Sequence, residues 1–138
     1  MNERTLGIIK PDATARNLTG TILQRIEDEG FRVVGMRQIL LSTNQAEGFY
    51  AEHRERPFFN DLVSFMTSGP VVLLAMEREE AITHWRTTMG KTKPSDAAPG
   101  TIRNTHGESI ERNSVHGSDS PTSASREVSY FFSCFDLV

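Results

Sequence analysis

The chain has 138 residues, 37% of them hydrophobic and 24% charged, and this composition fits a single globular domain spanning residues 1–138. Its formal net charge of −3 excludes a general electrostatic attraction to nucleic acid or to acidic membranes, so a bound anion must be held by a local cluster of positive groups. The lone cysteine, Cys134, cannot form an internal disulfide, and no apolar run reaches the length of a membrane span. We therefore expect a cytoplasmic protein with no membrane partner.

The first forty residues read as a strand, a helix and a second strand. The short apolar run Thr5–Ile9 predicts a strand, and Lys10-Pro11-Asp12 predicts a turn after it. Apolar residues at helical spacing between positions 18 and 26 predict a helix that ends at Gly30. Valines and other apolar residues within 31–41 indicate the second strand.

The middle of the chain continues this alternation. Ser42 and Gln45 form a capping-box pattern, which predicts a helix through about Tyr50. A further amphipathic helix is indicated by apolar residues at positions i, i+3, i+4 and i+7: Phe59, Leu62, Val63 and Met66. The continuous apolar run over 71–76 is typical of a central buried strand, and a helix over about 79–89 follows it.

Beyond Gly90, which closes that helix, the regular pattern stops. The segment from Lys91 to Ser120 shows little periodicity, so we expect either disorder or a functional loop. Order returns at Ser120-Pro121, a residue pair typical of a helix start, and the last helix has one apolar face. Strands separated by helices predict an α/β sandwich in which helices cover a small sheet.

The candidate chemistry gathers in the unpatterned segment. His116 lies there, just before the last helix begins, together with polar and basic residues that suit phosphate oxygens: Lys91, Thr92, Lys93, Arg103 and Asn113. The preceding helix adds Arg86. We interpret the segment as a phosphate-handling loop in which a histidine acts as a base, or as a nucleophile if its imidazole is neutral.

One motif resembles the active-site signature of nucleoside diphosphate kinases; it reads Asn113-Ser114-Val115-His116-Gly117-Ser118-Asp119-Ser120. Five further segments resemble the family in the same order: Ile8–Ala13, Phe49–His53, Arg56–Phe59, Phe65–Pro70 and Pro99–Arg103. The resemblance extends to about Phe132. It implies a ferredoxin-like βαββαβ core with an antiparallel sheet and additional surface helices.

The resemblance also implies an activity. The family transfers the γ-phosphate of a nucleoside triphosphate to a nucleoside diphosphate in a ping-pong cycle through a phosphohistidine. His116 matches the nucleophile, which attacks through Nδ1, and Glu127 matches the glutamate that orients it. Ser118 matches the serine beside that glutamate, and Tyr50 matches a tyrosine near the imidazole.

Further matches imply how the nucleotide is held. The residues that match phosphate ligands are Arg86, Thr92 and Arg103, and those that match ligands of the sugar 3′-hydroxyl are Lys10 and Asn113, with Lys10 also reaching phosphate. The residues that match the two apolar contacts of the base are Phe58, on which the base stacks, and Ile110. Stacking reads a π-face, so such a site would accept ATP, GTP and other nucleoside tri- and diphosphates.

The family implies Mg²⁺ as cofactor, held mainly by the nucleotide phosphates with no protein metal site, and a homo-oligomer, either a tetramer, a hexamer or a dimer. The other histidines, His53, His84 and His106, show no spacing that indicates a metal site. The chain departs from the family pattern at Lys91, at Lys93 and at Asn104-Thr105-His106, and these departures bear on the packing of the long loop.

Two other functions fit part of the pattern. The first is a catalytically silent, nucleotide-binding or regulatory scaffold of the same fold, but the full set of matched residues argues against it. The second is a nucleic-acid-binding protein, but the acidic pI near 5.8 and the lack of a basic aromatic stripe argue against that role.

Overall fold

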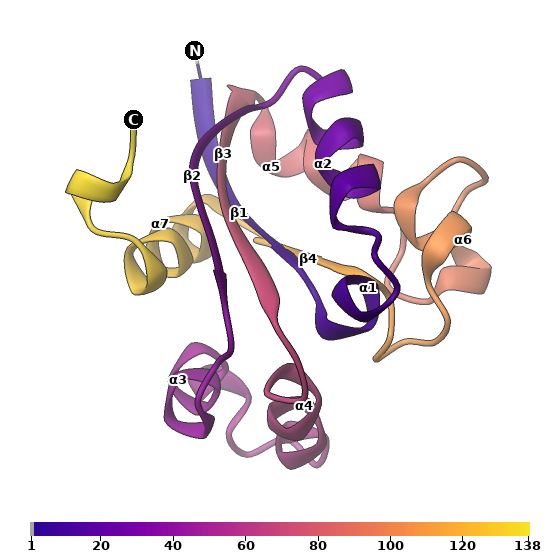
Figure 1. Cartoon of the computed structure of the whole chain (residues 1–138), viewed down its shortest axis with the longest axis vertical. Coiled ribbons are helices and arrows are strands. Elements are labelled where there is room, and N and C mark those ends of the chain that lie inside the picture. The colour runs from indigo at the N-terminus through magenta and orange to yellow at the C-terminus, as the bar shows by residue number, and fades with distance from the viewer. Residues whose placement is uncertain (1) are drawn as a thin grey trace.

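The computed structural model describes residues 2–138 as one four-stranded antiparallel sheet with helices on both faces (Figure 1). The strands are β1 (Asn2–Ile9), β2 (Arg32–Ile39), β3 (Val71–Glu79) and β4 (Val115–Gly117). Their order across the sheet is β2-β3-β1-β4, so the first and third strands of the chain are central. This is the ferredoxin-like βαββαβ arrangement that the family resemblance implies.

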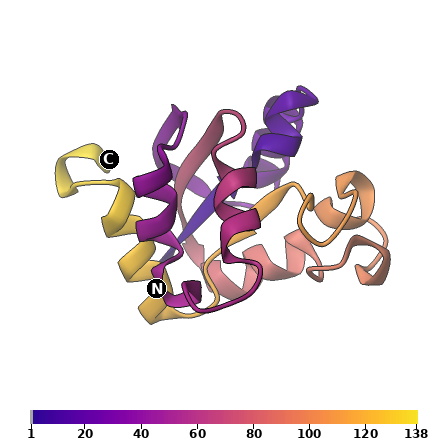
Figure 2. The same ribbon diagram turned by 90° about the horizontal axis from the view of Figure 1, so that it is seen from below.

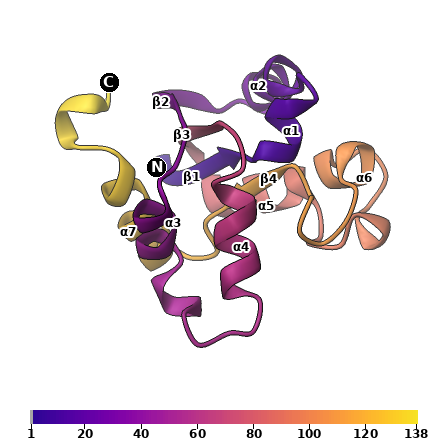
Figure 3. The same cartoon turned by 60° about the horizontal axis from the view of Figure 1, so that its bottom comes forward.

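Seven α-helices are present in residues 2–138, and most of them pack on the sheet. They are α1 (Pro11–Ala15), α2 (Thr19–Asp28), α3 (Thr43–Phe49), α4 (Phe59–Met66), α5 (Ala81–Met89), α6 (Ile102–His106) and α7 (Pro121–Phe131). Helices α2 and α5 cover one face, and α3, α4 and α7 cover the other. Figure 2 shows these layers from below, and Figure 3 shows α6 at the opposite side of the molecule from α3 and α7.

Strand β3 explains why the sheet has two apolar cores. Its residues 71–76 are all buried, and successive side chains point to opposite faces. Val71, Leu73 and Ala75 pack with α3, α4 and α7, whereas the side chains between and after them pack with α2 and α5. The continuous apolar run therefore is the central buried strand that the sequence predicts.

The predicted helix ends are confirmed where a specific residue sets them. Ser42 and Gln45 form the complete capping box of α3, and the Ser120 hydroxyl caps α7 by accepting a hydrogen bond from the Ser123 amide. Gly90 ends α5 at a φ of 86°, a conformation that favours glycine. The amphipathic helix predicted around residues 59–66 is α4.

The prediction for residues 91–120 is wrong in one respect, because this segment contains regular structure. Thr101 caps α6, with its hydroxyl accepting from the Asn104 amide, and β4 pairs with the end of β1. Each element has at most five residues, too few to show a periodicity in the sequence. A second short helix, α1, lies where the sequence predicts only a turn, and it begins at Pro11.

Other element bounds differ by a few residues from those expected. Strand β1 begins at Asn2 rather than Thr5, and β3 continues to Glu79, so α5 begins at Ala81. Both extensions are polar, but Arg4 and Glu77 face each other across the β1–β3 pair and form an ion pair. No helix within residues 2–138 has the length and apolarity that crossing a membrane requires.

Candidate active site

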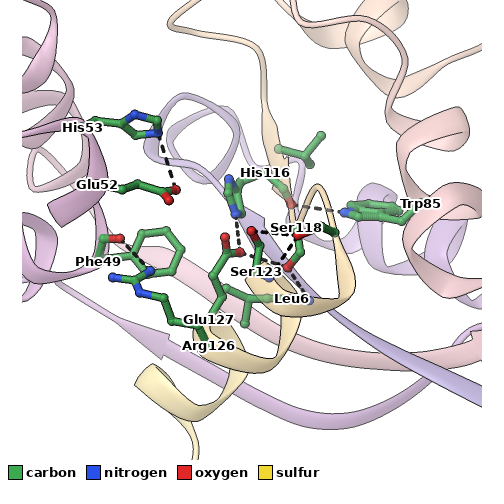
Figure 4. Close-up of polar contacts among 12 residues, drawn as sticks. Leu6, Phe49, Glu52, His53, Trp85, His116, Ser118, Ser123, Arg126 and Glu127 are labelled. Carbon is green, nitrogen blue, oxygen red and sulfur yellow. Dashed lines mark hydrogen bonds and ion pairs between the residues drawn. The ribbon is translucent and has the colours of Figure 1, made fainter. Parts of the chain in front are cut away.

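His116 lies in strand β4, at the edge of the sheet, and not in an irregular loop. It is paired with Ile8 of β1, and its carbonyl oxygen accepts a hydrogen bond from Nε1 of Trp85 at 3.1 Å. Gly117 allows this contact, since a Cβ there would lie 2.5 Å from Cδ1 of Trp85. Trp85, from α5, thus fixes the backbone of the histidine from the far side of the sheet (Figure 4).

The imidazole of His116 is held by a glutamate from the last helix. Nε2 of His116 lies 2.8 Å from Oε1 of Glu127, and the Ser118 hydroxyl donates to the same oxygen at 2.9 Å (Figure 4). Ser118 is itself fixed, because its hydroxyl accepts from the Leu6 amide of β1 at 3.3 Å. Glu127 is 6% exposed and Ser118 is fully buried, so the two form a rigid support for the ring.

This contact determines which ring nitrogen is available for chemistry. A carboxylate accepts hydrogen bonds, so Glu127 favours the imidazole tautomer with its proton on Nε2. The lone pair of Nδ1 is then free for attack, and the carboxylate faces the positive charge that would develop on the ring. The structure thus brings His116, Glu127 and Ser118 together as the sequence predicts.

Two aromatic residues of α3 and its end lie beside this group. Phe49 contacts His116 edge-on, with ring centroids 5.5 Å apart and planes at 73°. Tyr50 packs against Phe49 and is buried, and its burial together with the Glu127 charge raises the pKa of its hydroxyl. Phe49 begins one of the segments that resemble the family, but no role was assigned to it from the sequence; in the structure it contacts the imidazole directly.

Lys10 and Asn113 form a second buried pair. Lys10 donates from Nζ to Oδ1 of Asn113 at 2.8 Å and to the Glu111 carbonyl at 2.9 Å. The Asn113 side-chain amide in turn donates to the Thr92 carbonyl at 3.0 Å. Three of the five residues predicted to hold sugar and phosphate, Lys10, Thr92 and Asn113, are therefore linked directly.

The environment of Lys10 disfavours its charged form. Burial and, to a smaller extent, the Arg103 guanidinium lower the pKa of Lys10 to about 8, against the opposing effect of the Asp12 and Glu111 carboxylates. An anion beside Lys10 would reverse this effect, because an opposite charge favours the ammonium form. The charged form of the buried Lys10 would thus be stabilised by a bound anion.

Basic side chains also line a cavity of about 800 Å³ next to this pair. The cavity-lining residues include Arg86, Lys91, Thr92 and Arg103, which can contact an anion. Arg103 is anchored by donating to the Gly90 and Val115 carbonyls at 3.0 and 2.8 Å, and burial and the nearby Arg86 lower its pKa to about 10. This cavity contains three predicted phosphate ligands, but Lys10, Asn113 and His116 do not line it.

The two residues predicted to contact the base are solvent-accessible, which a binding role requires. Phe58 is 48% exposed at the start of α4, and Ile110 is 59% exposed in the segment before β4. His53 backs the Phe58 ring at a centroid distance of 5.7 Å. By contrast, the neighbouring Phe59 is buried in the core.

Within residues 2–138, no cluster of three His, Cys, Asp or Glu side chains could hold a metal ion. The remaining histidines have local partners instead. His84 lies 2.7 Å from Glu29, His53 lies 3.8 Å from Glu52, and burial lowers the pKa of His106.

Comparisons with known proteins identify the family of the chain. The family model described as nucleoside diphosphate kinase matches residues 3–137. The nucleoside diphosphate kinase of Geobacter sulfurreducens is 60% identical over 136 residues, 99% of each chain, and that of Maricaulis maris is 58% identical over 99% of this chain and 97% of its own.

Solved structures give the same result for the fold. The nucleoside diphosphate kinase of Aquifex aeolicus superposes with a TM-score of 0.98 at 42% identity over the whole of both chains. A halophilic nucleoside diphosphate kinase from Halobacterium salinarum, in complex with CDP, gives 0.97 at 41% identity over 100% of this chain and 92% of its own. The sequence motifs, the fold and the full-length identities lead to one conclusion: the chain belongs to the nucleoside diphosphate kinase family.

Proposed function

We propose that this nucleoside diphosphate kinase works through a phosphohistidine formed at Nδ1 of His116. The observation that carries the proposal is the 2.8 Å contact between His116 Nε2 and Glu127, which leaves Nδ1 as the nucleophilic nitrogen. Ser118 supports the same carboxylate oxygen. The side chain that would attack is therefore oriented before substrate arrives.

In the first half-reaction, the Nδ1 lone pair attacks the γ-phosphorus of a nucleoside triphosphate. An N–P bond forms, and the bond between that phosphorus and the bridging oxygen breaks, with its electron pair leaving on the nucleoside diphosphate. The proton stays on Nε2, hydrogen-bonded to the Glu127 carboxylate, and that carboxylate stabilises the positive imidazole. In the second half-reaction, a terminal oxygen of another nucleoside diphosphate attacks the phosphorus and restores the free Nδ1.

Positive charge around the transferred group supplies most of the remaining catalysis. Phosphoryl transfer spreads negative charge over three equatorial oxygens, which positioned cations stabilise. We assign this work to Arg86, Arg103 and Lys10, with the Thr92 hydroxyl as a neutral donor. Tyr50 packs against Phe49, which contacts the imidazole.

Nucleotide recognition divides into sugar and base contacts. Lys10 and Asn113 lie together and would share the sugar 3′-hydroxyl, and Phe58 with Ile110 would enclose the base. A stacked base is read by its face rather than its hydrogen-bonding edge, which fits ATP, GTP and other nucleotides as substrates. The CDP complex of the Halobacterium salinarum relative supports nucleotide binding by this chain.

The triphosphate would enter as its Mg²⁺ complex. The cavity beside Arg86 and Arg103 is lined by basic side chains with Asp96 and Asp119 as its acids, a setting that suits a phosphate chain carrying its own cation. Bound in this way, Mg²⁺ would neutralise phosphate charge. The phosphate oxygens would be its main ligands.

We further propose one catalytic domain over residues 1–138, assembled as a homo-oligomer and located in the cytoplasm. Strand β2 lies at the edge of the sheet and exposes Met36, and Leu40 directly after it is also exposed; they are 57% and 65% accessible, which favours contact with another copy. The exposed free thiol of Cys134 fits a reducing compartment.

The mechanism is tested by incubating the protein with γ-labelled ATP and Mg²⁺. Wild type should acquire an acid-labile, alkali-stable label that ADP or GDP discharges, and His116→Ala should acquire none. Equal labelling of His116→Ala would reject the proposed nucleophile. The variant Ser125→Ala, on the same helix as Glu127, is the matched control and should label normally.

A further inference from the structure

The three residues before His116 form a strained turn. Ser114 has a φ of 76°, and the Val115 amide donates to the Asn113 carbonyl at 2.9 Å, so the chain makes a γ-turn. A positive φ of this kind is rare and unfavourable for a residue with a side chain. Such strain persists only where surrounding contacts enforce it.

Those contacts come from the start of α1. Oδ2 of Asp12 accepts from the Ser114 amide at 3.0 Å, and the Lys10 amide donates to the Ser114 carbonyl at 2.9 Å. Both backbone groups of Ser114 are therefore held by residues 10 and 12. Ser114 is fully buried and Asp12 is 3% exposed, so water does not replace either bond.

Within residues 2–138, no further side-chain hydrogen bond helps to hold the Ser114 turn. The Ser114 hydroxyl has no hydrogen-bond partner in the described chain, and neither does Oδ1 of Asp12. Within residues 2–138, the buried Asp12 carboxylate thus has one hydrogen-bond partner outside its own segment, the Ser114 amide. Burial raises the pKa of this carboxyl, which means that burying its charged form lowers the stability of the folded protein.

The turn separates two groups with different tasks. On one side Asn113 contacts Lys10 and Thr92, and on the other side β4 begins and presents His116 to Glu127. A relaxed turn would move the sugar-binding amide relative to the nucleophile. Misplacement by about 1 Å is enough to slow a reaction roughly a hundredfold.

We propose that Asp12 is a positioning residue for phosphoryl transfer, because its carboxylate holds Ser114 in the turn that places Asn113 relative to His116. Asp12 does not touch the reacting atoms. The inference rests on the proposed phosphohistidine at His116, and its test can fail while that proposal stands.

The test compares the single-turnover rate of His116 phosphorylation in Asp12→Ala and Asp12→Asn, at about pH 6.5 to keep Lys10 charged. Both variants remove the charge, but only the asparagine keeps an oxygen that can accept from Ser114. We expect Asp12→Ala to be about 10–100-fold slower than wild type, with the asparagine variant recovering most of the rate. Asp61→Ala, an exposed aspartate in the first turn of α4, is the matched control and should not change the rate.

A double-mutant cycle with Ser114→Gly separates positioning from general damage. Glycine adopts a positive φ without strain, so the rate lost through Asp12→Ala should be smaller in the Ser114→Gly background. The sole tryptophan, Trp85, donates to the His116 carbonyl, so its fluorescence should change in Asp12→Ala while the circular dichroism spectrum does not.

Several results would overturn the inference. A wild-type rate in Asp12→Ala, an asparagine variant as slow as the alanine one, or an equal loss in the Ser114→Gly background would each do so. If Asp12→Ala does not fold, recovery of a folded, active protein by adding Ser114→Gly supports the proposal, and no recovery rejects it. Absence of any His116 phosphorylation in wild type would instead reject the proposed function.

Discussion

Oε1 of Glu127 lies 2.8 Å from Nε2 of His116 and also accepts the Ser118 hydroxyl at 2.9 Å. One buried carboxylate oxygen therefore sets the orientation and the tautomer of the imidazole. The protein achieves this by bringing a short edge strand against the last helix, with Trp85 and Gly117 fixing the strand from the other side.

Replacing Glu127 with glutamine should slow His116 phosphorylation about 10–100-fold and leave nucleotide affinity nearly unchanged. The amide cannot stabilise a positive imidazole and can present a donor to Nε2, which favours the wrong tautomer. Rapid-quench labelling measures the rate, and ADP titration measures the affinity. Glu55→Gln, an exposed glutamate, is the control, and a rate loss matched by an equal affinity loss would contradict the orienting role.

The lowered pKa of Lys10 predicts that kcat/KM depends on pH. Its pKa is lowered to about 8, so the free enzyme loses the ammonium as the pH rises through that value, and kcat/KM for nucleotide should fall there. Lys10→Met should have a lower kcat/KM without this descending limb. The same descending limb in Lys10→Met would assign it to another group.

The lowered pKa of Lys10 also affects the free energy of unfolding, through a contribution that should rise with pH where kcat/KM falls. Between about pH 8 and the ordinary lysine value of 10.5, the unfolded chain binds more protons than the native one, so the contribution of Lys10 to the free energy of unfolding should rise with pH. Chemical denaturation of wild type and Lys10→Met across this range measures the difference. A wild-type contribution that falls with pH would contradict the burial of the ammonium.

Phe58 and Phe59 should respond in opposite ways to alanine. Phe58 is 48% exposed, so Phe58→Ala should raise the nucleotide KM by roughly tenfold, corresponding to about 1–3 kcal/mol of stacking, with little loss of stability. Phe59 is 6% exposed, and Phe59→Ala should cost about 3–5 kcal/mol of unfolding free energy. An unchanged KM in Phe58→Ala would remove it from the base site.

Two glycine-to-alanine changes should also have opposite effects on the free energy of unfolding. A Cβ at Gly117 would lie 2.5 Å from Trp85 and 2.6 Å from Met89, so Gly117→Ala should destabilise the protein by about 1–3 kcal/mol and slow phosphorylation. Gly20 lies within α2 with no atom within 4 Å of an added Cβ, so Gly20→Ala should stabilise by about 0.5–1 kcal/mol. Thermal unfolding tests both, and a neutral Gly117→Ala would contradict the tight packing.

The sequence predicted the main elements because their signals are local. A continuous apolar run marked β3, the capping box marked α3, and Ser120-Pro121 marked the start of α7. Glu127 was identified through the family resemblance, and its place on α7 brings it to His116.

The parts that were missed depend on long-range contacts. Strand β4 has three residues and exists because β1 pairs with it, so no periodicity could reveal it. Phe49 and Trp85 were assigned no role from the sequence, and only the fold brings them to His116. Gly117 appeared only as part of the matched motif, and the fold shows that it lets Trp85 approach the backbone.

The most direct measurement identifies the ring nitrogen that carries the phosphate. The enzyme is phosphorylated with ATP and Mg²⁺, and phosphorus–nitrogen NMR of the protein labelled in histidine nitrogen locates the phosphate. The account predicts the phosphate on Nδ1 of His116, because Glu127 occupies Nε2. A phosphate on Nε2, or on any residue other than His116, would contradict it.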